Sequence, residues 1–131
     1  MPERKDLGGQ FARITRRLIE LEQPILEQHE LTMWEYVVLV RLRTAPAETQ
    51  LDLAQAIRYD KTRLIALLDG LHERGLIERK QAPADRRART IRLTGPGLTK
   101  VDAVSSDIHR MEDGLLPQAQ REQLQRLLDL F

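Results

Sequence analysis

The stretch from residue 60 to residue 93 constrains the fold more than any other part of the chain. Four leucines recur there at spacings of three and four, Leu64, Leu67, Leu68 and Leu71, which is the apolar stripe of an amphipathic helix. Asp60 is a good N-cap residue and Gly75 is well suited to end a helix in the left-handed conformation. The pattern therefore predicts a helix of about four turns over residues 60–74, followed at once by a basic hairpin.

The first turn of this predicted helix is cationic. Lys61, Thr62 and Arg63 stand there, and Arg58 lies in the turn before them. The positive end of a helix dipole favours acids, so cations at that end suggest that an anion is met there. A nucleic-acid groove supplies such an anion, and recognition helices contact bases through their N-terminal residues. On this helix alone, a solvated amphipathic helix is an equally good interpretation.

The hairpin that follows concentrates positive charge. Residues 79–92 hold six basic residues against one acid, namely Arg79, Lys80, Arg86, Arg87, Arg89 and Arg92 against Asp85. Their net charge is +5, whereas the whole chain carries +1, so the remaining residues carry −4. The alternation in residues 89–93 places Ile91 and Leu93 inward and polar residues outward, as in a half-exposed strand. A charge run is often only a solvated face, but directly after such a helix it favours DNA contact.

Helical spacing continues on both sides of this segment. Apolar residues at 7, 11, 14, 18, 21 and 25 form a heptad seam on a first helix, which we expect to bend at Pro24. Thr32 and Glu35 form a capping box with Leu31 and Tyr36 as a hydrophobic staple, so a second helix should run to about residue 43. Residues 49–51 predict a very short strand or a cap, and residues 52–57 predict the positioning helix of a helix-turn-helix pair.

Two helices are expected after the hairpin. Thr94 should cap the first of them, a long amphipathic helix that Gly114 and Pro117 end. A last helix follows with apolar residues at 124, 127, 128 and 131. The first and last helices are thus both amphipathic and lie outside the helix-turn-helix core. The heptad seam could pair two chains or pack within one, and the residues alone leave this open.

Several function classes find no support in the sequence. The chain has no cysteine, which excludes disulfides, thiolate metal ligands and a cysteine redox switch. Its three histidines lack metal-ligand spacing, and we find no nucleophile elbow, phosphate loop or dinucleotide fingerprint, so we expect no catalytic residues, metal or cofactor. There is no long apolar run and no signal-peptide core near the start, so we expect no membrane contact and a cytoplasmic protein.

The order of short motifs along the chain resembles the multiple-antibiotic-resistance regulator (MarR) family. The motifs are Leu31-Thr32, Leu53-Ala54, Asp60-Lys61-Thr62, Leu71 before Arg74-Gly75-Leu76, Asp85-Arg86-Arg87, and Leu93-Thr94 with Gly97. The resemblance implies a mainly α fold with a small antiparallel β wing, a winged helix-turn-helix with N- and C-terminal dimerisation helices. It divides the chain into a dimerisation helix at 1–30, the DNA-binding domain at 31–94 and further dimerisation helices at 95–131.

The function that the resemblance implies is a homodimeric, sequence-specific transcription regulator. It should bind double-stranded DNA at a pseudopalindromic operator and act as a repressor that a small amphipathic or aromatic ligand releases. The DNA-binding residues would be Arg58, Lys61, Thr62, Arg63, Arg79, Asp85, Arg86, Arg87 and Arg89. Ligand contacts would come from His29, Met33, Trp34 and Tyr36, for which core packing is a competing interpretation. The alternative function is a winged-helix protein-interaction module that does not read DNA.

Overall fold

The computed structural model describes residues 2–45, 48–82 and 85–131, and it describes no side chain from 82 to 88. The order of elements is α1 (Leu7–Gln28), α2 (Met33–Thr44), β1 (Glu48–Thr49), α3 (Gln50–Ile57), α4 (Lys61–Glu73), β2 (Ile77–Ala82), β3 (Asp85–Leu93), α5 (Gly95–Asp113) and α6 (Gln118–Leu128). The predicted fold class, a mainly helical chain with a small antiparallel wing, is confirmed.

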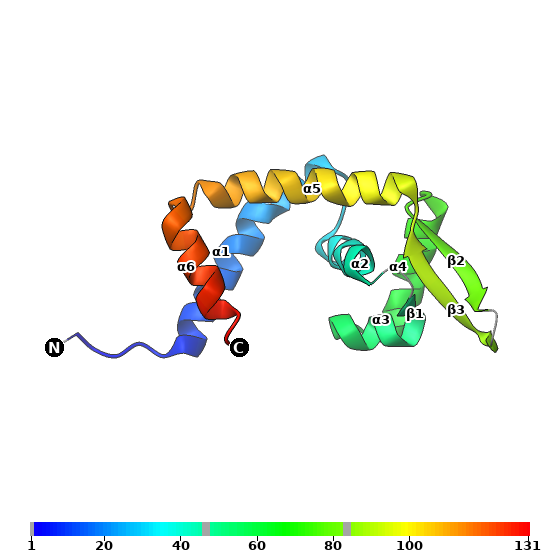
Figure 1. Ribbon diagram of the computed structural model, residues 1–131, viewed down its shortest axis with the longest axis horizontal. Coiled ribbons are helices and arrows are strands. Elements are labelled where there is room, and N and C mark those ends of the chain that lie inside the picture. The colour runs from blue at the N-terminus through cyan, green and yellow to red at the C-terminus, as the bar shows by residue number, and fades with distance from the viewer. Residues whose placement is uncertain (1, 46–47, 83–84) are drawn as a thin grey trace.

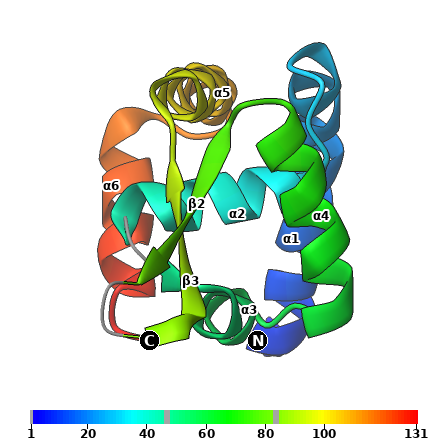
Figure 2. The same ribbon diagram turned by 90° about the vertical axis from the view of Figure 1, so that its right-hand side faces the viewer.

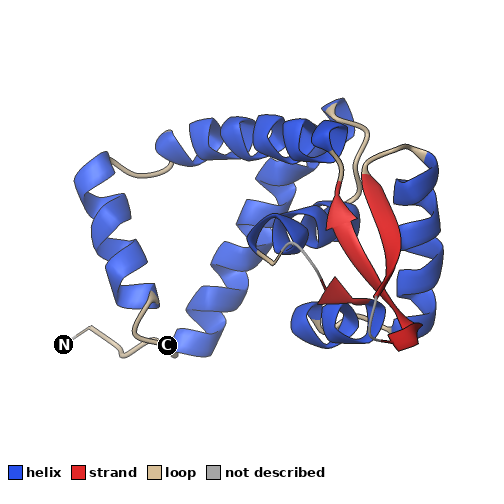
Figure 3. Cartoon of the chain, turned by 45° about the vertical axis from the view of Figure 1, so that its right-hand side comes forward, coloured by secondary structure: helices blue, strands red, loops and turns tan. Residues whose placement is uncertain are grey.

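The long helix α5 connects two parts of the molecule. Figure 1 shows α2, α3, α4 and the strands gathered near one end of α5, whereas α1 and α6 descend from the rest of it. The same division is visible in Figure 3, where all three strands lie on the side of α4. We call the part formed by α2, α3, α4 and the strands the lobe.

Capping residues set the starts of the helices in the lobe. The capping box predicted for α2 is present, because the Glu35 amide donates to Thr32 Oγ1 at 3.2 Å and the Thr32 amide donates to Glu35 Oε1 at 2.8 Å. Helix α3 begins at Gln50, two residues before the predicted start, because the Asp52 amide donates to Thr49 Oγ1 at 3.1 Å. Thr49 therefore serves both as the end of β1 and as the cap of α3.

The sheet has the order β1-β3-β2, and both pairs of strands are antiparallel. Strands β2 and β3 form the hairpin that we call the wing, in which Ile77 pairs with Leu93 and Arg79 pairs with Ile91. Strand β1 places Glu48 opposite Ile91 on the other edge of β3. Arg41 of α2 binds the Glu48 carboxylate, and this hydrogen bond raises the pKa of Arg41. The pair joins α2 to the sheet.

One hydrophobic core holds the lobe and most of α5 together. Its side chains come from every element of the lobe except β1, from the end of α1 and from α5, where Val101, Val104 and Ile108 are buried. In α4 the buried residues are Leu64, Leu68 and Leu71, as the leucine spacing predicts, and Leu67 packs against them while half-buried. The core thus continues from the lobe into α5, and the division at residues 30 and 94 stays a prediction about function.

The junction between the wing and α5 depends on two glycines. Gly75 has φ +74°, as predicted for the residue that ends α4. Gly97 lies against the backbone of Leu76, so that a Cβ at this position would stand 1.9 Å from the Leu76 carbonyl oxygen. Thr94 caps α5 and also donates a hydrogen bond from Oγ1 to the Gly75 carbonyl at 2.6 Å. These contacts hold the start of α5 to the start of the wing.

Candidate nucleic-acid interface

The first turn of α4 presents its polar side chains to solvent. Lys61, Thr62 and Arg63 are exposed, whereas the leucines that begin with Leu64 face the core. Asp60 precedes them and accepts a hydrogen bond from the Arg63 amide at 2.9 Å, as its N-cap position predicts. The arrangement leaves two cationic side chains at the positive end of the helix dipole, where an anion would be stabilised.

The turn between α3 and α4 is held by an unusual backbone and an aromatic contact. Arg58 ends α3 with φ 52° and ψ 52°, a left-handed conformation that few residues other than glycine adopt. Its side chain is exposed. The next residue, Tyr59, lies against Trp34 of α2 with ring centroids 4.4 Å apart. This contact fixes the direction in which α4 leaves the turn, and with it the position of Arg58.

The wing carries exposed cations on a strand with one buried face. Ile91 is buried, as the alternation predicts, whereas Leu93 is only half-buried. Arg92 binds Glu78 across the hairpin with 2.7 Å between Nε and Oε1. Lys80 and Arg89 are exposed near the far end of the wing. Lys80 pairs with Thr90 and lies on the face opposite Ile91, whereas Arg89 lies on the same face as Ile91. The wing therefore presents basic side chains on both faces near its far end.

Arg79 was predicted to bind DNA, but in the structure its side chain is paired and largely buried. Its Nη1 lies 2.7 Å from Oδ1 of Asp69 on α4, and its side chain is only 18% exposed. Asp69 was not among the predicted site residues, since an acid on an exposed helix face carries no sequence signal of its partner. The structure thus joins the wing to α4 through a pair that the sequence did not indicate.

Three of the predicted DNA-binding residues cannot be placed by their side chains. Asp85, Arg86 and Arg87 lie in β3 by their backbone, but their side chains fall outside the described residues. Their contribution to the interface stays a prediction.

The N-terminal end of α4 and the far end of the wing lie on the same side of the lobe. In Figure 2 both are at the end opposite α5, with α4 on one side of the hairpin. The exposed cations Lys61 and Arg63 of α4 and Lys80 and Arg89 of the wing are thus carried toward one end of the molecule. A polyanion that follows this end of the lobe would meet positive charge from both elements.

The four residues predicted to bind a ligand do not gather around one space. His29, at the end of α1, lies 2.7 Å from Asp107 of α5 through its Nε2, and Tyr36 shares a hydrogen bond of 2.8 Å with Ser105 of α5. Trp34 points to the turn before α4, where it is 40% exposed beside Tyr59. Met33 packs against the core. Met33 and Tyr36 fit the competing interpretation, core packing, whereas Trp34 is exposed and His29 is paired. Ligand binding by the four residues stays a prediction.

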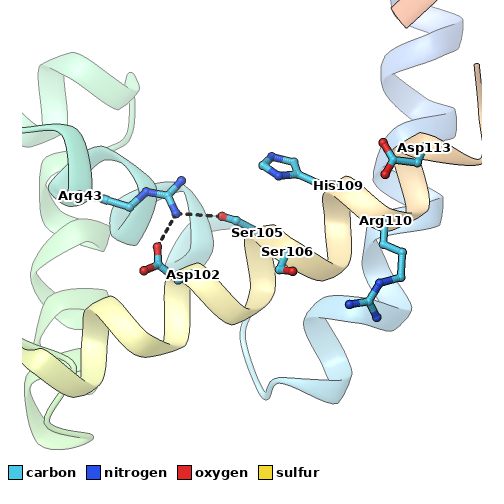
Figure 4. A pocket seen from close by; sticks show the side chains of 7 residues that line it. All are labelled: Arg43, Asp102, Ser105, Ser106, His109, Arg110 and Asp113. Carbon is cyan, nitrogen blue, oxygen red and sulfur yellow. Dashed lines mark hydrogen bonds and ion pairs between the residues drawn. The ribbon is translucent and has the colours of Figure 1, made fainter. Parts of the chain in front are cut away.

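A different set of residues lines an open groove beside α5. The groove has a volume of about 490 Å³ and is lined by Arg43, Asp102, Ser105, Ser106, His109, Arg110 and Asp113. Figure 4 shows that all but Arg43 come from α5 and that Arg43 reaches across to Asp102 and Ser105. Both of these contacts involve its Nη1, at 3.0 Å and 3.2 Å. This groove could not be predicted from the sequence, because its residues are polar side chains with no motif spacing.

The part of the chain that the structure describes shows neither a metal-binding cluster nor a membrane-spanning helix. Among the side chains that the structure describes, those of residues 2–45, 48–81 and 89–131, no three histidines or carboxylates gather so that they could hold a metal ion. Among the helices of the same residues, none combines the length and the apolarity that crossing a membrane requires.

Comparison with known proteins adds a family match and several structural neighbours. The model of the MarR family matches residues 31–88. A mutant of MarR from E. coli is 24% identical, with a TM-score of 0.85 over 98% of this chain and 97% of the other. The transcriptional repressor CouR, bound to a 23-mer DNA duplex, is 25% identical, with a TM-score of 0.82 over 98% of each chain. A mutant of MepR from S. aureus is 27% identical, with a TM-score of 0.81 over 95% of each chain.

The family match and the fold agree on the same part of the molecule. Residues 31–88 cover α2, α3, α4 and most of the wing, which are the elements that carry the cationic surface. The structural neighbours extend the shared fold to α1, α5 and α6, because they align over nearly the whole chain. The family match over residues 31–88 and the fold shared along nearly the whole chain identify a winged helix-turn-helix similar to that of the MarR regulators.

Proposed function

We propose that this protein is a homodimeric transcription regulator that binds a pseudopalindromic operator and acts as a repressor. The observation that carries the proposal is the cationic first turn of α4, which lies beside the basic wing at one end of the lobe. A recognition helix that enters the major groove places such a turn against base edges, while a neighbouring hairpin meets the backbone. Two proteins that share this fold have been seen with nucleic acid, CouR with a DNA duplex and a MepR mutant with an oligodeoxyribonucleotide.

The proposed contacts divide into two groups. Lys61, Thr62 and Arg63 would meet bases in the major groove, since they stand on the exposed first turn of α4. Arg58 and Arg89 would lie against the DNA backbone on either side of that turn. Asp85, Arg86 and Arg87 of the wing would act at the minor groove, where an arginine responds to groove width and phosphate charge.

Uncovered apolar surface on α1 and α6 supports the dimer. None of the residues of α6, all of which the structure describes, is buried. Large apolar side chains remain exposed on both helices and the chain end, among them Leu7, Phe11, Leu124, Leu127, Leu128 and Phe131. A second copy that packed its own α1 and α6 here would bury these side chains. Two lobes related by a two-fold axis would then meet half-sites about 34 Å apart.

A DNA-binding titration tests the proposal directly. Fluorescence anisotropy would follow a labelled duplex from the region upstream of the protein's own coding sequence, in competition with a random duplex and at several salt concentrations. Arg63→Ala should lose about 1–3 kcal/mol of discrimination between the two duplexes, because an arginine paired with guanine contributes that much. Arg87→Ala should instead weaken binding to both duplexes and reduce the log–log salt slope by about 0.9 for each phosphate that the arginine neutralises.

The same titration separates the proposal from its alternative. If the parent protein binds neither duplex tightly and Arg87→Ala changes neither affinity nor salt slope, the wing does not touch DNA. The winged-helix protein-interaction module then becomes the better description.

The dimer has its own test in solution. Phe11→Asp and Leu124→Asp each place a charge on the uncovered apolar surface and should give monomers or aggregates in sedimentation or light scattering. Leu51→Asp is the matched control, since Leu51 is similarly exposed but lies on α3 in the lobe. A parent protein that sediments as a clean monomer would rule the dimer out.

Release by a small aromatic or amphipathic ligand is the last part of the proposal. Trp34 is the single tryptophan of the chain, so its fluorescence reports on a ligand that binds beside it, near Tyr59. An aromatic acid that regulates the protein should change this fluorescence and weaken DNA binding together, because it must bind the two states with different affinity. A change in fluorescence without a loss of DNA affinity would mean a site without regulatory coupling.

A further inference from the structure

The ion pair between Arg79 and Asp69 connects the two DNA-facing elements of the lobe. Arg79 is the third residue of β2 and Asp69 lies in the third turn of α4, and their Nη1 and Oδ1 atoms are 2.7 Å apart. Asp69 follows Thr62 by seven residues, which places both on the same side of the helix. The side of α4 that would face DNA therefore carries an acid, and a wing arginine covers it.

Among the described residues, Asp69 is the partner that holds the guanidinium of Arg79. Its Nε and Nη2 atoms are buried, and among the described residues they have no hydrogen-bond partner. Arg79 and Asp69 border a cavity of about 270 Å³ between the wing and α4, lined also by Gln50, Ile65, Arg89 and Ile91. Ile65 and Ile91 contribute apolar side chains to this cavity. Removal of Asp69 would thus leave a partly buried cation without the carboxylate that fixes its position.

We infer that Arg79 and Asp69 act as a clamp that positions the wing relative to α4, and that Arg79 is not itself a DNA contact. The inference rests on the proposed function, since positioning matters for DNA only if α4 and the wing bind it together. Because a largely buried arginine has already given up much of its hydration and faces a carboxylate, it is poorly placed to exchange that partner for a phosphate. Arg79 is then a positioning residue, in contrast to the exposed cations Lys80 and Arg89.

For the removal of Asp69, the clamp predicts a change in DNA affinity opposite to the one that charge repulsion alone predicts. Removal of an acid from a DNA-binding surface should tighten binding, because it removes repulsion from the phosphates. Removal of Asp69 should instead weaken binding, since the wing is no longer held in place. A close, partly buried ion pair of this kind supports an expected loss of about tenfold or more in DNA affinity.

The test compares five variants of the full chain by fluorescence anisotropy, with the duplexes used above and at several salt concentrations. Asp69→Asn and Arg79→Met remove either half of the pair, and their double variant completes a mutant cycle. Arg79→Lys keeps the charge and should retain part of the affinity. Glu73→Gln is the matched control, because Glu73 is the other acid of α4 and is also exposed. Asp69 is 59% exposed, so Asp69→Asn should fold even if Arg79→Met does not.

The expected result is a similar loss of affinity in Asp69→Asn and Arg79→Met, no further loss in the double variant, and a salt slope equal to that of the parent protein. Glu73→Gln should bind as tightly as the parent or more tightly. Tighter binding by Asp69→Asn would overturn the clamp. So would a salt slope lowered by about 0.9 in Arg79→Met alone, which would mean that Arg79 itself neutralises a phosphate.

Amide hydrogen exchange in the absence of DNA tests the clamp independently of the proposed function. Asp69→Asn and Arg79→Met should speed the exchange of amides in β2 and β3, whereas Glu73→Gln should not. Unchanged exchange in the wing of Asp69→Asn would overturn the clamp whatever the DNA result. A parent protein that binds no duplex would refute the proposed function, and the exchange result would still decide whether the pair holds the wing.

Discussion

Gly97→Ala should be among the most damaging single-methyl changes in this protein. The added Cβ would stand 1.9 Å from the Leu76 carbonyl oxygen and 2.9 Å from its carbonyl carbon. These are backbone atoms, so no side-chain rotation relieves the clash. The same carbonyl accepts the Thr94 amide at 3.1 Å, so moving it also disturbs the cap of α5.

The magnitude follows from two opposing effects. Alanine is favoured over glycine in a helix by about 1 kcal/mol, so without a clash the change would be stabilising. To restore a normal separation, α5 must move away from the wing by more than about 1 Å, and overpacking of that kind costs about 1–3 kcal/mol or more. Because the clash is with backbone atoms, we expect a cost at the upper end of this range, about 3 kcal/mol, and hence a net loss of about 2 kcal/mol in the free energy of unfolding. The melting temperature should fall by roughly 5–10 °C for a chain of this size.

The assay is thermal and urea denaturation at one fixed protein concentration, because the stability of the proposed dimer would depend on concentration. Gly95→Ala is the matched control, since a Cβ there meets nothing within 4 Å and the residue lies in the same helical turn. Gly95→Ala should be neutral or slightly stabilising. Equal effects of the two changes would refute the reasoning from the close approach at Gly97.

Three further changes test other contacts. Thr94→Ala removes the cap of α5 and the hydrogen bond to Gly75, so it should cost about 1–2 kcal/mol in urea denaturation, and Thr99→Ala on the exposed face should cost nothing. Burial and then Glu112 raise the pKa of Glu22, so its ionisation destabilises the fold above the ordinary value of 4.5. Glu22→Gln should therefore stabilise at pH 7, and this gain should shrink as the pH falls and vanish below 4.5; a gain that persisted there would contradict the cause. Tyr59→Leu should lose about 0.5–1.5 kcal/mol and change Trp34 emission, because the rings lie 4.4 Å apart; unchanged emission would argue against this contact in solution.

The order of elements could be predicted because local signals decide it. The capping box at Thr32, the leucine spacing in α4 and Gly75 after it each depend on residues only a few positions apart. Backbone sterics and helix capping act over that range, so the sequence holds the whole signal. The start of α3 was predicted two residues late, because the cap at Thr49 and the first turn of the helix overlap with the short strand β1.

The candidate interface was predictable only in part. The helical period places Thr62 opposite the buried leucines of α4, so its exposure could be predicted. Lys61 stands seven residues before Leu68, on the leucine side, so its exposure does not follow from the period. The wing was recognisable from its charge and its alternation. Arg79 looked like the other wing cations, however, since nothing in its neighbourhood along the chain distinguishes a paired arginine from a free one.

By itself, the sequence determined which segments are helices, most of their ends, and where positive charge concentrates, since these properties depend on short-range spacing. Only the tertiary structure decided that Arg79 meets Asp69, that His29 meets Asp107, and that Gly97 lies against Leu76. Each of these contacts joins two different elements, and His29 and Asp107 are 78 residues apart along the chain. The geometry of such contacts depends on how the helices pack, because many side chains of the shared core set the distance between two elements together.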